Sequence, residues 1–219
     1  MTPVHNPQYD EFLYEKSSRN RIRVMARTLF ASLGYDNTST AVIARNAGTS
    51  ESQMMKHFGG KAGLLDAIFT EGWERINAQL EACFESSSDF NARLSCIPGV
   101  VFSVLEQDLE LKTLVLLEAH RMRETARLHP EGPGYARFIA MIDHVIENAK
   151  TADEYRGKVL PLRSAIVGMI EGSVREQVLA ARANFPARYD SEDYRKLFSA
   201  FLRTVVSGEA PGQHIHAGQ

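Results

Sequence analysis

The residues from Ser50 to Lys61 carry hydrogen-bonding side chains at a spacing that suits contact with DNA. Ser50 and Gln53 have the S-x-x-Q form of a capping box, in which each side chain satisfies a backbone amide of the other at a helix start. Gln53 is also the natural bidentate partner of adenine in the major groove. The two roles compete for one side chain, and the sequence leaves both open.

The neighbouring side chains suit the same surface. Glu51 can accept a hydrogen bond from cytosine, and Ser52 is short enough to let the backbone approach a base pair. Met55 can meet a thymine methyl group or be partly buried. Lysine, histidine and threonine side chains suit contact with phosphate. The candidate DNA-binding residues are Thr38, Thr49, Ser50, Glu51, Ser52, Gln53, Met55, Lys56, His57 and Lys61.

Three short helices are expected to position these residues. Residues 19–33 place apolar side chains at offsets 0, 3, 4, 7, 8 and 11, which is a stripe of helical period ending before Gly34. A second helix is expected from Thr38 or Ser39 to Ala47, and a third follows Ser50 and ends before Gly59. Two short helices joined by a glycine-containing turn form a helix-turn-helix.

This stretch resembles the TetR family of bacterial transcriptional regulators. The resemblance rests on the pattern Leu29-Phe30-x-x-x-Gly34-Tyr35-x-x-Thr38-Ser39-x-x-x-Ile43-Ala44-x-x-Ala47-Gly48-x-Ser50, followed by His57-Phe58-x-x-Lys61-x-x-Leu64-Leu65. Every element falls at the family's spacing without insertion or gap. The resemblance implies a dimeric regulator that binds a palindromic operator in double-stranded DNA and carries an effector site in its helical C-terminal part.

Three positions depart from the family's usual residues. Met55 stands where the family usually has a tyrosine, so this chain has no phenol hydroxyl there to donate to a phosphate. Glu51 stands where a lysine is common, and Gly59-Gly60 replaces the usual pair before Lys61. These differences leave the expected fold unchanged and alter the expected contacts with DNA.

Charge is divided unevenly along the chain. Residues 1–61 hold eight Lys and Arg against five Asp and Glu, whereas residues 62–219 hold 17 against 22. This asymmetry is expected when one end meets phosphate. The apolar runs are too short to span a membrane, so we expect a cytoplasmic protein without membrane contact. In a reducing cytosol, Cys83 and Cys96 are expected to be buried free thiols.

The rest of the chain has apolar residues at helical spacing in six further segments and no sustained strand alternation. The predicted fold is therefore all-α with about nine helices. We expect a helix-turn-helix DNA-binding domain over residues 1–65, a helical effector-binding and dimerisation domain over 66–206, and a disordered tail over 207–219. Pro98 is expected to start or kink one helix, and Pro161 to lie in the first turn of another.

Two sites are expected in the C-terminal domain. Aromatic and methionine side chains give an adaptable apolar wall, and one histidine could orient a polar group of the effector. The candidate lining is Phe102, Leu116, His120, Phe138, Met141 and Met169. Small residues and an apolar stripe on the last two helices suit a homodimer interface, with Gly168, Gly172, Leu197, Phe198, Phe201 and Leu202 as candidates.

The sequence favours a dimeric DNA-binding transcriptional regulator, with a repressor released by a small-molecule effector as the leading hypothesis. One alternative is a protein that organises DNA without an effector. The other is an all-α enzyme, which is disfavoured because the sequence shows no nucleophile–base pair, metal motif or glycine-rich phosphate loop. No cofactor and no metal are expected, and the sequence does not identify the effector or the operator.

Overall fold

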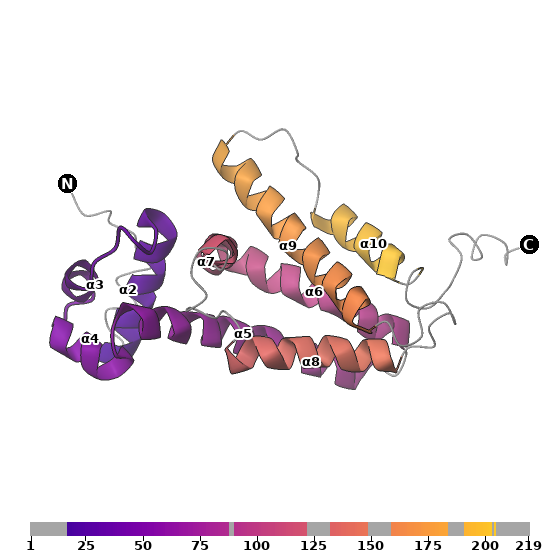
Figure 1. Ribbon diagram of the computed structural model, residues 1–219, viewed down its shortest axis with the longest axis horizontal. Coiled ribbons are helices and arrows are strands. Elements are labelled where there is room, and N and C mark those ends of the chain that lie inside the picture. Colours follow the sequence, from indigo (N-terminus) through magenta and orange to yellow (C-terminus); the bar gives the residue numbers. More distant parts are fainter. Residues whose placement is uncertain are drawn as a thin grey trace, which may run out of the picture. The chain divides into compact units, whose positions relative to one another are not determined.

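The structure, a computed structural model, describes residues 17–87, 90–121, 132–148, 159–183, 191–202 and 204. The chain is all-α over these ranges, as the sequence predicts, and Figure 1 shows the order of the helices. The helices described are α2 (Ser18–Leu33), α3 (Thr40–Asn46), α4 (Glu51–Phe58), α5 (Lys61–Ser86), α6 (Phe90–Gln107), α7 (Leu109–Arg121), α8 (Pro133–Glu147), α9 (Val159–Ala183) and α10 (Ser191–Leu202).

The chain divides into two compact units. The first contains the chain up to Gly72 together with Thr113–Gly132, and the second contains Trp73–Lys112 and the chain from Pro133 onward. We call residues 17–72 the head and the second unit the body. The division falls inside α5, so this one continuous helix contributes residues to both units.

The head is built on apolar faces of its three short helices, which pack against one another. Burial of a large apolar side chain stabilises a fold by roughly 1.5–3 kcal/mol, so a few such residues can hold a small domain. The fully or almost fully buried apolar residues of these helices are Ile22, Ala26, Phe30, Ile43, Ala44, Met54 and Phe58.

The body is a layered helical bundle in which α6 packs against α10 and α8, and α8 packs against α9. The side chain of Trp73 lies against the rings of Tyr135 and Phe138, with centroid distances of 5.1 Å to each. A Cβ atom at Gly134 would lie 2.6 Å from Trp73 Cβ, so glycine is required for this approach. Asn77 Nδ2 donates to the Gly134 carbonyl at 2.9 Å, which fixes the start of α8 on α5.

Some helix limits differ from the expected ones. Helix α6 begins at Phe90 and contains Pro98 in its interior, so the proline does not start it. Pro161 lies in the first turn of α9, as expected. The expected tail over 207–219 lies outside the described residues. Within the described ranges, no helix is both long and apolar enough to cross a membrane.

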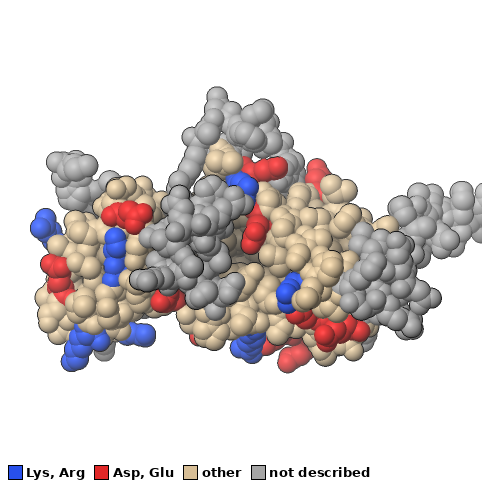
Figure 2. All heavy atoms as spheres, viewed as in Figure 1, with Lys and Arg blue, Asp and Glu red and all other residues tan. Residues whose placement is uncertain are grey.

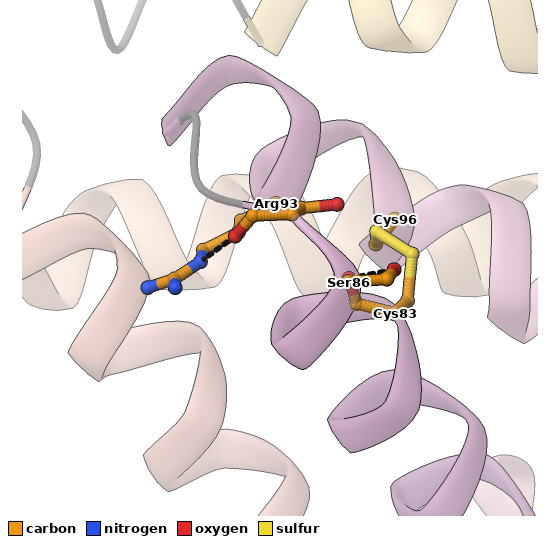
Figure 3. The surroundings of a disulfide bond; sticks show 5 residues. Cys83, Ser86, Arg93 and Cys96 are labelled. Carbon is orange, nitrogen blue, oxygen red and sulfur yellow. Dashed lines mark hydrogen bonds between the residues drawn. A yellow bond between two sulfur atoms is a disulfide. The ribbon is translucent and has the colours of Figure 1, made fainter.

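The prediction of two free thiols is wrong, because Cys83 and Cys96 form a disulfide. The two residues are 13 positions apart, with a Cα–Cα distance of 6.3 Å. Cys83 lies in the last turn of α5 and Cys96 in the first turns of α6, so the disulfide joins the end of one helix to the start of the next (Figure 3). Each cysteine taken alone fits an amphipathic pattern, and their pairing depends on which helix faces meet.

Candidate DNA-binding interface

Helix α4 is held with one face in the core of the head and the other in solvent. Ser50 is its N-cap, and its side chain accepts a hydrogen bond from the Gln53 backbone N–H at 3.2 Å. At the other end Gly59 adopts a left-handed conformation with φ of 69° and donates its N–H to the Met55 carbonyl at 2.8 Å. Met54 and Phe58 are buried, whereas residues 51–53, 55 and 56 of α4 are exposed.

The outward face of α4 carries most of the predicted DNA-binding residues. The exposed residues of this group are Ser50, Glu51, Ser52, Gln53, Met55 and Lys56. The Ser50 half of the capping box is present, whereas among the described residues no hydrogen bond is made by the Gln53 side-chain amide. The cap therefore uses the Gln53 backbone and leaves its amide group exposed at the amino end of the helix.

The turn before α4 is fixed by backbone hydrogen bonds. Gly48 has a φ of 60°, which favours glycine, and the N–H of Thr49 donates to the Ala44 carbonyl at 2.9 Å. Arg21 Nε donates to the Ala47 carbonyl at 3.3 Å and so ties α2 to this turn. Helix α3 has its own N-cap, because the Ser39 side chain accepts from the Val42 N–H. The turn before α4 is thus held by hydrogen bonds within the motif and by one bond from α2.

Charged groups border the outward face. The Thr40 hydroxyl donates to Glu51 Oε2 at 2.6 Å, which holds the carboxylate against α3. His57 Nε2 lies 2.9 Å from the Ser18 hydroxyl, and the Arg19 guanidinium lies 5.4 Å from the centre of the Phe58 ring. Figure 2 shows Lys and Arg side chains standing out from the surface of the head. Together with the unpaired amides of a helix start, such cations favour phosphate.

Two predicted DNA-binding residues make contacts inside the head. Thr38 is 1% exposed, and its hydroxyl lies 2.7 Å from the Gly34 carbonyl. Lys61 Nζ donates to the carbonyls of Tyr35 at 2.8 Å and Thr38 at 3.1 Å, and lies 4.2 Å from the Tyr35 ring centre. These bonds join the start of α5 to the loop between α2 and α3.

Sequence reasoning missed Arg45 as a candidate. It is exposed in the last turn of α3, next to the turn that leads into α4. Its position could have indicated it, because a basic residue at the end of the first helix of the motif is close to the recognition helix and is not needed for the apolar core. Thr40 was also missed, because its contact with Glu51 joins residues of two helices.

Two of the predicted effector residues, Phe102 and Phe138, take part in different aromatic clusters of the body. Phe102 packs against the rings of Tyr194 and Phe198, at centroid distances of 5.4 and 6.5 Å. Phe138 belongs instead to the cluster around Trp73. Met141 and Met169 are half-buried, and the side chains of Leu116 and His120 lie outside the described part.

The body also contains a polar group of residues that the sequence did not indicate. Lys112 is 9% exposed, and its ammonium group donates to Gln177 Oε1. Burial lowers the pKa of Lys112 from its ordinary value, while the nearby Glu106 carboxylate acts in the opposite direction. Arg75 Nη1 donates to Asp108 Oδ2 at 3.0 Å, and the Asp108 side chain accepts from the Leu111 N–H at 2.9 Å, which starts α7.

The predicted dimer residues divide into exposed and buried positions. Leu197 is 70% and Phe201 45% exposed, whereas Phe198 and Leu202 lie in the core of the body. A Cβ atom at Gly168 or Gly172 would meet no described atom within 4 Å, so this face of α9 is open in the single chain. Helix α10 therefore carries an exposed apolar edge, and α9 carries an open face at its glycines.

The head, with its capped helix-turn-helix and exposed polar face, defines a DNA-binding protein. Residues 22–68 match the family described as bacterial regulatory proteins, tetR family. The match covers most of the head, from within α2 to the start of α5, and so includes α3 and α4. The chain therefore carries a DNA-binding domain of the tetR family, as the motif predicts.

Similarity to individual proteins extends over most of the chain. The nucleoid occlusion factor SlmA of Marinomonas sp. (strain MWYL1) is 26% identical over 160 residues, which cover 72% of this chain and 80% of that protein. The structure of the fatty acid degradation regulator FadR from Bacillus halodurans matches with a TM-score of 0.72 at 19% identity, covering 86% of this chain and 98% of that one. FadR from Bacillus subtilis in complex with stearoyl-CoA matches with a TM-score of 0.69 at 21% identity, covering 87% and 98%.

Proposed function

We propose that the chain acts as a homodimeric repressor that binds a palindromic operator and releases it when a small molecule binds the body. The observation that carries the DNA-binding part is the exposed outward face of α4, on which Gln53 keeps its side-chain amide free of the cap. We assign base reading to Gln53 and phosphate contact to Lys56, with Ser52 and Met55 between them. Arg45 is added to the phosphate contacts because of its exposed place at the end of α3.

The experiment for DNA binding starts with a duplex selected from a random pool by the wild-type protein. Gln53→Ala should relax base preference at one position in each half-site, at a cost of roughly 1–3 kcal/mol per contact. Gln107→Ala is the matched control, since Gln107 is an exposed glutamine of the body. An unchanged base preference in Gln53→Ala would show that another residue reads the operator.

The dimer part of the proposal is supported by the exposed edge of α10. Leu197 and Phe201 are large apolar side chains left in solvent by the single chain, and such patches mark interaction surfaces. The open face at Gly168 and Gly172 allows a second backbone to approach closely. A two-fold dimer also places two copies of α4 on half-sites about one helical turn, roughly 34–36 Å, apart or a multiple of that.

The effector part is supported by the neighbour that holds stearoyl-CoA, because the same arrangement of helices there accommodates a small-molecule ligand. Stearoyl-CoA is therefore the first probe, followed by a panel of other metabolites. An effector should bind the form that does not hold DNA more tightly; a difference of about 1.4 kcal/mol gives tenfold release. Release of the selected duplex by a compound that also raises the melting temperature would support the repressor.

A second function is favoured by the relatedness to SlmA, which is a nucleoid occlusion factor. In that case the chain would bind DNA and organise it without any effector. Binding to the selected duplex would be the same, and no compound of the panel would release it. The two functions therefore differ in one measurable property, which is the dependence of DNA affinity on small molecules.

A further inference from the structure

We propose that Cys83 and Cys96 form a reversible thiol–disulfide site, whose redox state sets the DNA affinity of the protein through α5. Its reaction partners are small thiols and their disulfides. The chain contains two cysteines, and both are in this one bond. The effect of the disulfide on DNA affinity rests on the proposed function.

The two cysteine residues differ in exposure. Cys96 is 8% exposed, with the fully buried Ile97 beside it in sequence, whereas Cys83 is half-buried. An incoming thiolate therefore reaches the Cys83 sulfur first, because access decides which sulfur of a disulfide is attacked. In Figure 3 the Arg93 side chain extends away from the sulfur atoms, and its Nε donates to the Ser87 carbonyl at 2.8 Å. This side chain does not cover the bond.

The reaction is a two-step exchange. A small thiolate attacks Sγ of Cys83 and forms a mixed disulfide there, while the bond to Cys96 breaks and Cys96 leaves as a thiolate. That thiolate takes a proton from water. A second small thiolate then attacks the sulfur of the bound small molecule and releases Cys83, which is also protonated. Two small thiols are oxidised to one disulfide, and the protein gains two electrons and two protons.

The surroundings let the bond reopen and close again without unfolding the chain. The Ser86 hydroxyl donates to the Cys83 carbonyl at 2.8 Å, so Cys83 lies where the backbone hydrogen bonding of α5 ends. Leu94 and Ile97 are fully buried on either side of Cys96, so their packing keeps the body folded while the first turns of α6 loosen. With a sequence separation of 13 residues the two thiols stay close, which favours bond formation over reaction with another molecule.

The first turns of α6 are the part that reduction releases. Pro98 lies inside this helix and has no N–H, so the carbonyl of Leu94 lacks its usual partner. The disulfide links these less stable first turns of α6 covalently to the end of α5. Helix α5 begins at Lys61, whose ammonium group bonds to two carbonyls of the head. A change at the last turn of α5 therefore acts on a helix whose first residue is part of the DNA-binding domain.

The chemical half of the test uses the full-length protein in buffers with different ratios of reduced to oxidised glutathione. Free thiols are then alkylated and counted by mass spectrometry. We expect the folded protein to pass between zero and two alkylated cysteines, and hydrogen exchange in residues 92–98 to become faster in the reduced state. A disulfide that resists reduction until the chain is unfolded by denaturant would overturn the proposal.

The functional half compares binding of the selected duplex by the oxidised and reduced proteins. We expect Kd to change by about fivefold or more, the lower end of typical coupling between two sites. The control is Cys83→Ser with Cys96→Ala, which should respond to neither buffer; reduced and alkylated wild-type protein replaces it if that variant does not fold. Equal affinity in both states would overturn the inference alone. Loss of DNA binding in both states would overturn the proposed function as well, while the thiol count would still report on the disulfide.

Discussion

The head and the body of this regulator are specified by different kinds of contact. In the head, several helix ends have their own capping residue: Ser39 and Ser50 cap two helices, and Gly59 ends one of them. In the body, helix positions depend on which side chains meet across the bundle, such as Trp73 with Phe138 and Cys83 with Cys96. Capping contacts within a few residues set the ends of the helices at the DNA-binding surface, whereas long-range contacts decide which faces of the body remain open.

The largest predicted change in stability comes from adding one methyl group to the head, at Gly63. A Cβ atom at Gly63 would lie 2.0 Å from the Phe58 carbonyl oxygen, which is backbone and cannot move aside. Gly63→Ala should therefore destabilise the head by about 3 kcal/mol and abolish DNA binding. In the body, Gly99→Ala meets no described atom within 4 Å and should stabilise α6 slightly, because alanine favours helices. Thermal unfolding of both variants measures the difference, and equal melting temperatures would contradict this account.

The second prediction concerns the open face of the body. Leu197→Asp places a charge on the exposed edge of α10 and should turn dimers into monomers, lowering operator affinity by about 100-fold because a monomer binds one half-site only. Leu109→Asp is the matched control, because Leu109 is also 70% exposed. Analytical ultracentrifugation reports the association state. A dimer that survives Leu197→Asp would remove α10 from the interface.

A third prediction separates two lysines that have the same charge and the same expected role in the sequence. Lys56 is exposed, so Lys56→Ala should flatten the salt dependence of DNA binding by about 0.9 in log–log slope for each phosphate that the lysine neutralises. Lys61→Ala instead removes bonds to two carbonyls of the head and should lower its stability by roughly 1–2 kcal/mol. Salt titrations and thermal unfolding of the two variants distinguish the roles. A flattened slope in a fully stable Lys61→Ala protein would restore Lys61 to the DNA-binding residues.

The smallest expected effect is a pH dependence of the body. Burial lowers the pKa of Lys112 in the folded state, so the unfolded chain binds more protons between this lowered pKa and the ordinary value of 10.5. Stability should therefore rise with pH through that window, since the folded state no longer holds a buried charge. Lys112→Met should lose this rise. Chemical unfolding of both proteins at several alkaline pH values measures it, and parallel curves would show that Lys112 stays equally solvated in both states.

The extent to which the sequence predicts the structure follows the same division. Ser50, Gly59, Met54 and Phe58 could be assigned from the sequence because caps and helical spacing act within a few residues. The apolar stripe of α10 was also recognisable, but the burial of Phe198 and the exposure of Leu197 depend on where α6 packs. The same limit explains the disulfide, since no local pattern shows that Cys83 faces Cys96.

Within the candidate site, the exposure of the residues on the outward face of α4 could be predicted from the sequence, whereas the contacts of residues at the junctions between helices could not. Lys61 has the charge and position of a phosphate contact, yet its ammonium group lies within reach of two carbonyls once α5 and the loop after α2 come together. Thr38 is similar, because its hydroxyl bonds to the chain around it. A sequence shows that a side chain has the chemistry to contact DNA. It does not show whether that side chain instead bonds to another part of the folded chain.

The most direct test of the central claim is a structure of the protein bound to a duplex selected from a random pool. We expect a two-fold dimer with the amino end of each α4 in a major groove and Gln53 within hydrogen-bond distance of a base edge. The two copies of α4 should be roughly 34–36 Å apart or a multiple of that. A complex in which α4 faces solvent, while another part of the chain contacts the DNA, would contradict the assignment of α4 as the recognition helix.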